Sequence, residues 1–202
     1  RDAAASLPPG DHALAENLLG RLVAERSEAR ERLLRDVLAS ERYLRLLDAL
    51  VAGAASPRLD EKAEGRAKDV VPGLVRRPWK KLRREVAALG DDPSDEALHR
   101  VRIRAKRARY AAEVAVPVFG SAATKLAQAI GALQDVLGDH HDAVVAESWL
   151  RTSAAGPSTD GAGALVAGEM IGLERAEAAR LRRAWPPAWK AAAKAGRVRW
   201  LS

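Results

Sequence analysis

The chain has 202 residues, enough to bury a core as one domain or two small ones, and it contains no cysteine. Disulfides and thiolate metal sites are therefore excluded, and no run of 18 apolar residues or signal-like start predicts a membrane span or export. From these features we expect a cytoplasmic protein. The net charge of +7 lies entirely in residues 76–109, which hold twelve Lys or Arg and five acids. A basic segment in an otherwise neutral chain indicates a site for a polyanion.

Alanine, leucine, arginine and glutamate dominate the sequence, and strict alternation of polar and apolar residues is absent, which predicts an all-α fold. A first long helix is expected over residues 11–39, with Asp11 as its N-cap, and a second from Ser40 to about Gly53. Leucines at helical spacing give each helix an apolar stripe, as in a helical bundle. Residues 53–73 are weakly patterned and are expected to form a connection with one short helix over 59–70.

The first basic helix is predicted over residues 75–89, with Pro78 in its first turn. Its basic flank consists of Arg76, Lys80, Arg83 and Arg84. The turn at 90–93 is short, so this helix and the next are expected to be antiparallel neighbours that present their basic flanks to one space.

The second basic helix is predicted over residues 94–114, capped by Ser94, and residues 98–110 read L-H-R-V-R-I-R-A-K-R-A-R-Y. At 100° per residue, the small apolar side chains form a packing stripe, and a row of protonatable or cationic residues flanks it. This row is His99, Arg102, Lys106 and Arg109, whereas Arg100, Arg104 and Arg107 point roughly the other way. Glu113 alone relieves the repulsion at i,i+4 spacing, so we expect a partner to supply the counter-charge. Nearby cations disfavour the charged form of His99 unless an anion is bound.

The remainder of the chain is expected to be helical as well. Pro117 and Gly120 end the basic helix, and the next helix is predicted over residues 121–137, with Gly138 just past its end. An exposed turn at 139–142 is expected to carry His140 and His141, before a helix over 143–152 and a mobile loop over 153–163. A last helix is predicted over 164–185, broken by Pro186 and Pro187, and then a short docking helix in the tail. The sequence thus predicts six or seven helices in one antiparallel bundle or two.

Motifs for catalysis or metal binding are absent from the sequence. Consecutive residues such as Asp139, His140, His141 and Asp142 rarely converge on one ion in a turn, and no H-x-x-x-H spacing occurs, so we expect no metal and no cofactor. No G-x-S-x-G or Walker motif is present, which favours a non-enzymatic role. A nucleic-acid-binding module is a weaker alternative, because Trp79 is the only aromatic residue within 76–109 and no helix-turn-helix pattern is found.

Two motifs, L-H-x-x-R-I-x-x-K-R-x-R-Y at 98–110 and L-Q-D-x-L-G-x-x-x-D at 133–142, resemble the second half of the CHAD family, the conserved histidine α-helical domain. The stretch S-E-R-Y-L-R-L-L-D at 40–48 is similar too. The resemblance implies two four-helix bundles related by a pseudo-twofold axis, with basic residues lining a central channel that binds inorganic polyphosphate, in some members at polyphosphate granules. It assigns ligand binding to His99, Arg102, Lys106, Arg107 and Arg109, and more loosely to Arg76, Lys80, Arg83 and Arg84.

The chain departs from the family pattern at its start, because the earlier copy of the His-x-x-Arg helix is missing. Arg1-Asp2 resembles the end of an L-G-x-x-R-D segment in the first half, which implies a single domain over residues 1–202 that lacks its first two helices. We expect non-enzymatic polyphosphate binding by helices 75–89 and 94–114. The alternatives are an accessory domain of a metal-dependent triphosphate or polyphosphate hydrolase, or a nucleic-acid binder. Expected partners include a second copy of the chain or a fused triphosphate tunnel metalloenzyme domain.

Overall fold

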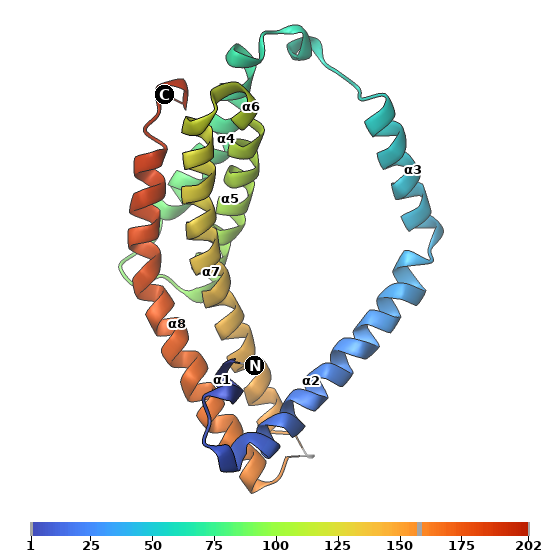
Figure 1. Cartoon of the computed structure of the whole chain (residues 1–202), viewed down its shortest axis with the longest axis vertical. Helices are drawn as coiled ribbons and strands as arrows, with labels where there is room; N and C mark the ends of the chain where they lie inside the picture. The colour runs from blue at the N-terminus through green and yellow to red at the C-terminus, as the bar shows by residue number, and fades with distance from the viewer. Residues whose placement is uncertain (1, 157–158, 202) are drawn as a thin grey trace. The chain divides into compact units, whose positions relative to one another are not determined.

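The computed structural model describes residues 2–156 and 159–201, and this part of the chain is built from eight α-helices and short 3₁₀ or π-helical turns (Figure 1). No strand occurs among these residues, which confirms the all-α prediction. The chain divides into two compact units, one formed by Arg1–Glu61 with Leu150–Met170 and the other by Lys62–Trp149 with Ile171–Ser202. All the residues of the predicted site belong to the second unit.

The first unit begins with α1 (Asp2–Ala5) and α2 (His12–Arg32), which continues into a π-helical segment at Leu33–Leu38. After it comes α3 (Glu41–Ala55). The predicted cap of α3 is confirmed, because the hydroxyl of Ser40 accepts a hydrogen bond from the Tyr43 amide at 3.2 Å. Asp11 occupies the N-cap position of α2 as predicted, but its side chain makes no capping hydrogen bond.

The apolar stripes of α2 and α3 are largely uncovered. In α2 only Ala15 and Leu18 are buried, and α3 has no buried residue. Large side chains farther along the predicted stripe, such as Val37 and Leu47, are exposed. The periodicity therefore predicted the helices correctly, but the packing expected of their apolar faces is not formed within this unit.

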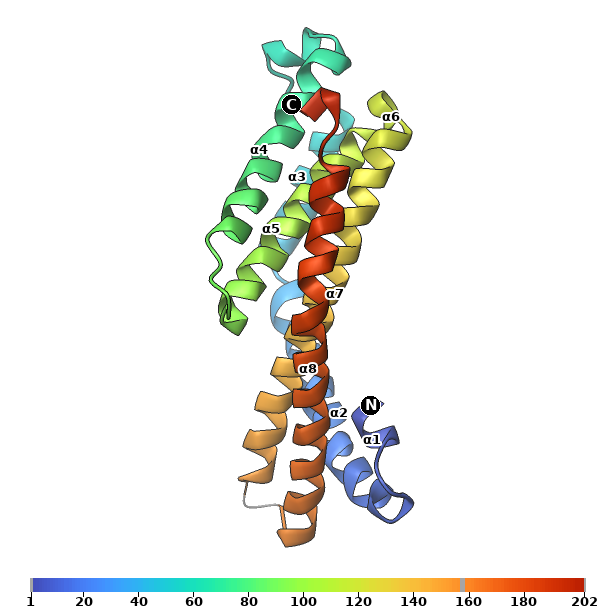
Figure 2. The ribbon, with the colours of Figure 1, turned by 90° about the vertical axis from the view of Figure 1, so that its left-hand side faces the viewer.

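The second unit contains α4 (Ala67–Ala87), α5 (Asp95–Val114), α6 (Val116–Phe119) and the larger parts of α7 (Ser121–Ala154) and α8 (Gly161–Ala195). As predicted, α4 and α5 are antiparallel neighbours that lie side by side (Figures 1 and 2). The α5 cap is confirmed as well, because the Ser94 hydroxyl accepts from the Ala97 amide at 3.3 Å. The predicted α5 stripe is buried throughout: Leu98, Val101, Ala105, Ala108 and Ala112. This stripe packs in one core with Val75, Leu82, Leu126, Ile130, Leu133 and Leu137.

α4 begins at Ala67, so the prediction of a connection up to residue 73 and a helix from about 75 was wrong. Pro72 and Pro78 both lie inside the helix. A proline removes one backbone hydrogen bond and usually ends or kinks a helix. Here the apolar period extends back to Val71, which packs against the core beside Val75. Tertiary packing of this face therefore outweighs the local signal of the prolines.

α7 and α8 are each one continuous helix where the sequence predicted interruptions. Gly138 lies in the middle of α7, so the predicted turn at 139–142 is wrong. α8 runs through Pro186 and Pro187, so the predicted break is wrong too. The predicted break between α5 and α7 is confirmed at Gly120, whose φ of 54° is in the left-handed region. The predicted loop at 153–163 is shorter than expected, because α7 extends to Ala154 and α8 begins at Gly161. Residues 157–158 of this loop lie outside the described residues.

The end of the chain returns to the core of the second unit. A 3₁₀ turn at Arg199–Leu201 buries Leu201, and the Trp200 ring stacks on Phe119 with centroids 4.5 Å apart. On the neighbouring face, Trp79 and Trp189 are in ring contact at 5.8 Å. The tail thus docks as predicted, although most of its helical part belongs to α8.

Candidate functional site

The cationic row of α5 lies against glycines of α7. A Cβ placed on Gly138 would be 3.4 Å from Nε of Arg102, and one placed on Gly131 would be 3.5 Å from Cδ of Arg109. The two arginines are seven residues apart on α5, and the two glycines are seven residues apart on α7. Each arginine therefore crosses α7 at a glycine, and the two crossings are about two helical turns apart. We call this surface the α5–α7 groove; it comprises His99, Arg102, Lys106 and Arg109 of α5 with Gly131, Gly138 and His141 of α7.

Three buried nitrogens in this groove have no hydrogen-bond partner among the described residues: His99 Nδ1, Arg102 Nε and Arg109 Nε. Most buried polar atoms in folded proteins are paired, and an unpaired one costs about 1–3 kcal/mol. Within the row, Nη1 of Arg109 forms an ion pair with Glu113 at 3.7 Å. The row therefore retains hydrogen-bonding capacity and positive charge that the described residues do not satisfy.

At the Arg109 end of the row, Arg109 and Gly131 line a cavity of about 470 Å³. Its lining combines Arg109 with two carboxylates, Glu113 and Asp135, and with the polar side chains of Thr124 and Gln128. This mixed lining is less suited to a polyanion than the part of the groove near Arg102. Lys106 and Arg109 both lie over the exposed ring of Tyr110, at 5.9 and 5.0 Å from its centroid.

At the other end of the groove, the His99 ring contacts the ring of His141 on α7, with centroids 4.2 Å apart and planes at 36°. Burial lowers the pKa of His99, and the neighbouring His141 and Arg102 lower it further. His99 is therefore neutral near pH 7, as expected from the cations around it. The prediction that His140 and His141 are exposed turn residues was wrong, because both lie on α7 and His140 is buried.

The predicted basic flank of α4 does not line the α5–α7 groove. Nε of Arg76 donates a hydrogen bond to the Leu201 carbonyl at 3.5 Å, and Lys80, Arg83 and Arg84 are exposed. The expectation that the flanks of Arg76 and His99 face one space is thus wrong. The helical wheel explains this, since the side of α4 that meets α5 is about 100° or more from Arg76.

A second cationic cavity, of about 120 Å³, is formed by other residues of the two basic helices. It is lined by Arg77, Pro78 and Lys81 of α4 with Arg104 and Arg107 of α5, and no carboxylate lines it. We call it the α4–α5 groove. Arg107 therefore lies apart from the row containing Arg102, although both belong to one motif. Glu85 pairs with Arg100 at 3.1 Å and with Arg104 at 3.4 Å.

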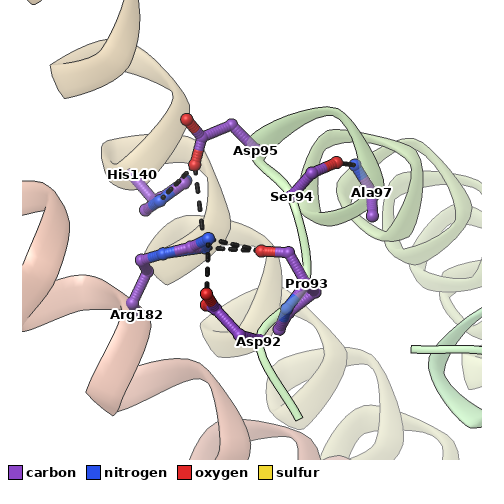
Figure 3. Close-up of polar contacts among 7 residues, drawn as sticks. All are labelled: Asp92, Pro93, Ser94, Asp95, Ala97, His140 and Arg182. Atoms are coloured by element: carbon purple, nitrogen blue, oxygen red, sulfur yellow. Dashed lines mark hydrogen bonds and ion pairs between the residues drawn. The ribbon is translucent and has the colours of Figure 1, made fainter. Parts of the chain in front are cut away.

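A polar cluster fixes the start of α5 against α7 and α8 (Figure 3). Arg182 of α8 donates from both terminal nitrogens to the Pro93 carbonyl, and it pairs with Asp92 at 3.5 Å and Asp95 at 3.7 Å. Asp95 also lies 3.4 Å from Nε2 of buried His140, an approach without hydrogen-bond geometry. Burial lowers the pKa of His140, with Asp95 opposing this and Arg182 and His141 adding to it. The cluster orients the first turn of α5, which immediately precedes His99.

The packing of His140 and His141 against α5 was not predicted from the sequence, although the sequence contains a signal for burial of His140. Leu126, Ile130, Leu133 and Leu137 are spaced at four and three residues, and His140 continues that period by three more. The described residues contain no group of three His, Asp or Glu side chains that could hold a metal ion. Among the helices described, none is long and apolar enough to cross a membrane.

Comparison with known proteins places this site in a family. Two proteins of Mycobacterium tuberculosis, both described as uncharacterized and coming from two strains, are 36% identical to the chain over 127 residues. The match covers 61% of this chain and 24% of each relative, so the chain spans about a quarter of the length of these curated relatives. A family model described as the CHAD domain matches residues 1–151. Because this match covers well over half of the chain and includes both motifs of the site, the protein belongs to the CHAD family.

Proposed function

We propose that the second unit binds inorganic polyphosphate in the α5–α7 groove and catalyses no reaction on it. The observation that carries this proposal is the set of buried, unpaired nitrogens of His99, Arg102 and Arg109 along one groove. Phosphate oxygens are strong acceptors and bear the negative charge that the row lacks. Family membership supports the same ligand class.

The chemistry of the row suits a bare chain of phosphates. Arginine presents a planar fork that can contact two oxygens, whereas Lys106 is a flexible point charge. Arg102 and Arg109 are separated by about 10 Å along the helix axis, so the groove would contact successive phosphate groups rather than a single one. A ligand of this kind would also hold the protein at polyphosphate granules.

The α4–α5 groove supplies a second contact for a long polyanion. Four cations, Arg77, Lys81, Arg104 and Arg107, line one small cavity. Among them Arg104 forms an ion pair, with Glu85. A helix with side chains is only about 10–12 Å across, so one long chain can reach both flanks of α5. Removal of these cations should weaken binding to long chains more than binding to short ones.

Single-stranded nucleic acid is the second candidate ligand, and one observation favours it. Tyr110 is exposed beside Lys106 and Arg109, and an aromatic ring among cations can stack on a base. Trp79, in contrast, is buried in the core and offers no such surface. Tyr110→Ala should weaken RNA binding and leave polyphosphate binding unchanged if both ligands use this surface.

Charge reversal tests the proposed site directly. The double variant Arg102→Glu with Lys106→Glu should abolish binding to long-chain polyphosphate in a calorimetric titration while its helical circular dichroism is retained. The matched control is Arg26→Glu with Arg30→Glu, which makes the same change in net charge on exposed positions of α2. An equal loss of affinity in both variants would show that only overall charge matters, and unchanged binding in the first would remove the proposed site.

The alternative role as part of a metal-dependent hydrolase has its own test. Incubation of tripolyphosphate with the protein and Mg²⁺ or Mn²⁺ should release no phosphate above a protein-free blank. Turnover that EDTA abolishes would contradict the proposal of a non-enzymatic domain.

A further inference from the structure

The His99–His141 contact joins two helices at one level of the α5–α7 groove. His141 lies three residues after Gly138, the residue over which Arg102 crosses α7. The guanidinium and the two imidazoles are therefore neighbours, and Nδ1 of His99 and Nε of Arg102 are both buried without a partner among the described residues. The position of His141 is a variable one in the motif that indicated the site, so the motif gave it no role.

From this geometry we propose that His141 is a further phosphate ligand, and that the His99–His141 pair takes up a proton when a phosphate group binds. The inference rests on the proposed function and adds to it a binding residue and a dependence on pH. A phosphate between the two rings and Arg102 would accept from a protonated imidazole as well as from the guanidinium.

The charges around the pair determine the direction of the effect. Within one turn on α5 are Asp95, Glu96, Arg100 and Arg102, of which Arg100 pairs with Glu85. On α7 they are Asp139, His140 and Asp142, while Arg182 of α8 acts on His140. Of the acids, Asp95 is shared between His140 and Arg182. Glu96, Asp139 and Asp142 are exposed and weakly coupled through solvent. Burial of His99, with His141 and Arg102 beside it, therefore disfavours the charged form of His99 in the absence of an anion.

Binding of an anion reverses this balance. In the unliganded protein the pKa of His99 lies below its usual value, because of burial and the neighbouring His141 and Arg102. A bound phosphate raises the pKa of His99, so a proton is taken up between its low unliganded pKa and the higher liganded one. Affinity rises as the pH falls through the liganded pKa and levels off below the unliganded one. Uptake of one proton makes the affinity rise about tenfold per pH unit within that window.

The experiment measures affinity for long-chain polyphosphate from pH 8 to pH 5.5 at constant ionic strength, with calorimetry at pH 6.5 in two buffers of different ionisation enthalpy. The internal phosphates of long chains stay ionised over this range, so the titrating groups belong to the protein. The wild type should bind about tenfold or more tightly at pH 6 than at pH 8 and take up close to one proton. His141→Gln should flatten this dependence, and His141→Arg should keep tight binding with much less proton uptake.

The chain offers a matched control, since His12 lies in the first unit, where its Nε2 contacts the Leu7 carbonyl at 2.9 Å. His12→Gln should behave as the wild type does. Proton uptake of wild-type size in His141→Gln, or wild-type affinity that does not change with pH, would overturn this inference and leave the proposed function intact. If the wild type binds long-chain polyphosphate at none of these pH values, the proposed function is overturned, and this inference with it.

Discussion

Replacement of Arg182 by alanine tests how the start of α5 is held in place. The guanidinium donates two hydrogen bonds to one oxygen, the carbonyl of the buried Pro93, so we count them as one charge-assisted contact worth about 1.5–3 kcal/mol. The pair with Asp92 adds little, because that carboxylate is 96% exposed. The pair with Asp95 is long at 3.7 Å. We therefore expect Arg182→Ala to lower the free energy of unfolding of the second unit by about 2–3 kcal/mol.

The assay is a urea titration followed by tryptophan fluorescence, which reports on the second unit because all five tryptophans lie in it. With a urea dependence of about 2 kcal/mol per molar, the midpoint should fall by about 1 M. Arg183→Ala is the matched control, because this exposed neighbour on α8 has no partner among the described residues, and its effect should stay within about 0.5 kcal/mol. Equal midpoints for the two variants would refute the reasoning that this cluster stabilises the unit.

Two further predictions concern the same unit. Gly196→Ala should destabilise it by about 1–3 kcal/mol, because the new Cβ would overlap the Trp79 ring. Gly172→Ala, on open helix surface of the same unit, should be neutral or slightly stabilising; thermal melting compares the two. Because burial lowers the pKa of His140, the unfolded state binds its proton more readily, so stability is fully present above about pH 6.5 and declines as the pH falls below it. Urea midpoints at pH 7 and pH 5 should differ less in His140→Gln than in the wild type, and an equal difference would assign the acid sensitivity to other groups.

The basic helix α5 could be predicted almost completely from the sequence. Its apolar stripe, its Ser94 cap and its first-turn acids all favour the same helix, and burial of the stripe from Leu98 to Ala112 agrees with that periodicity. When local preference, pattern and packing agree in this way, the element and its register follow from the residues alone. The four side chains of the row were placed on one flank for the same reason.

The packing of the cationic row against α7 could not be predicted, because part of the α7 sequence favours a turn rather than a helix. Gly138 costs about 1 kcal/mol relative to alanine in a helix interior, and the Asp-His-His-Asp stretch after it is typical of a turn. Burial of Leu133, Leu137 and His140 on one face outweighs this cost. The absence of a side chain at Gly138 has a positive role instead, since it admits Arg102.

The sequence alone could also not predict that the basic residues are divided between two separate grooves. A helical wheel places Arg107 away from Arg102, and the motif alone groups them as one set of ligands. Only the packing of α4 beside α5 shows that Arg107 meets Arg77 and Lys81. The contact between His99 and His141 similarly depends on the register of two helices, which neither motif determines.

A shaped polyphosphate site should distinguish polyphosphate from other polyanions, whereas a merely basic surface should not. The affinities for long-chain polyphosphate, heparin and single-stranded RNA should be measured side by side from 50 to 200 mM salt. The three permanent cations of the α5–α7 groove and the four of the α4–α5 groove together predict a slope of about −5 in log affinity against log salt, or a loss of about 10³-fold over this range. We expect polyphosphate binding to remain the tightest as salt rises, because we propose that the side chains of His99, Arg102 and Arg109 bind its phosphates in one site. Equal affinities for the three polyanions, screened together, would contradict the account and leave only a basic surface.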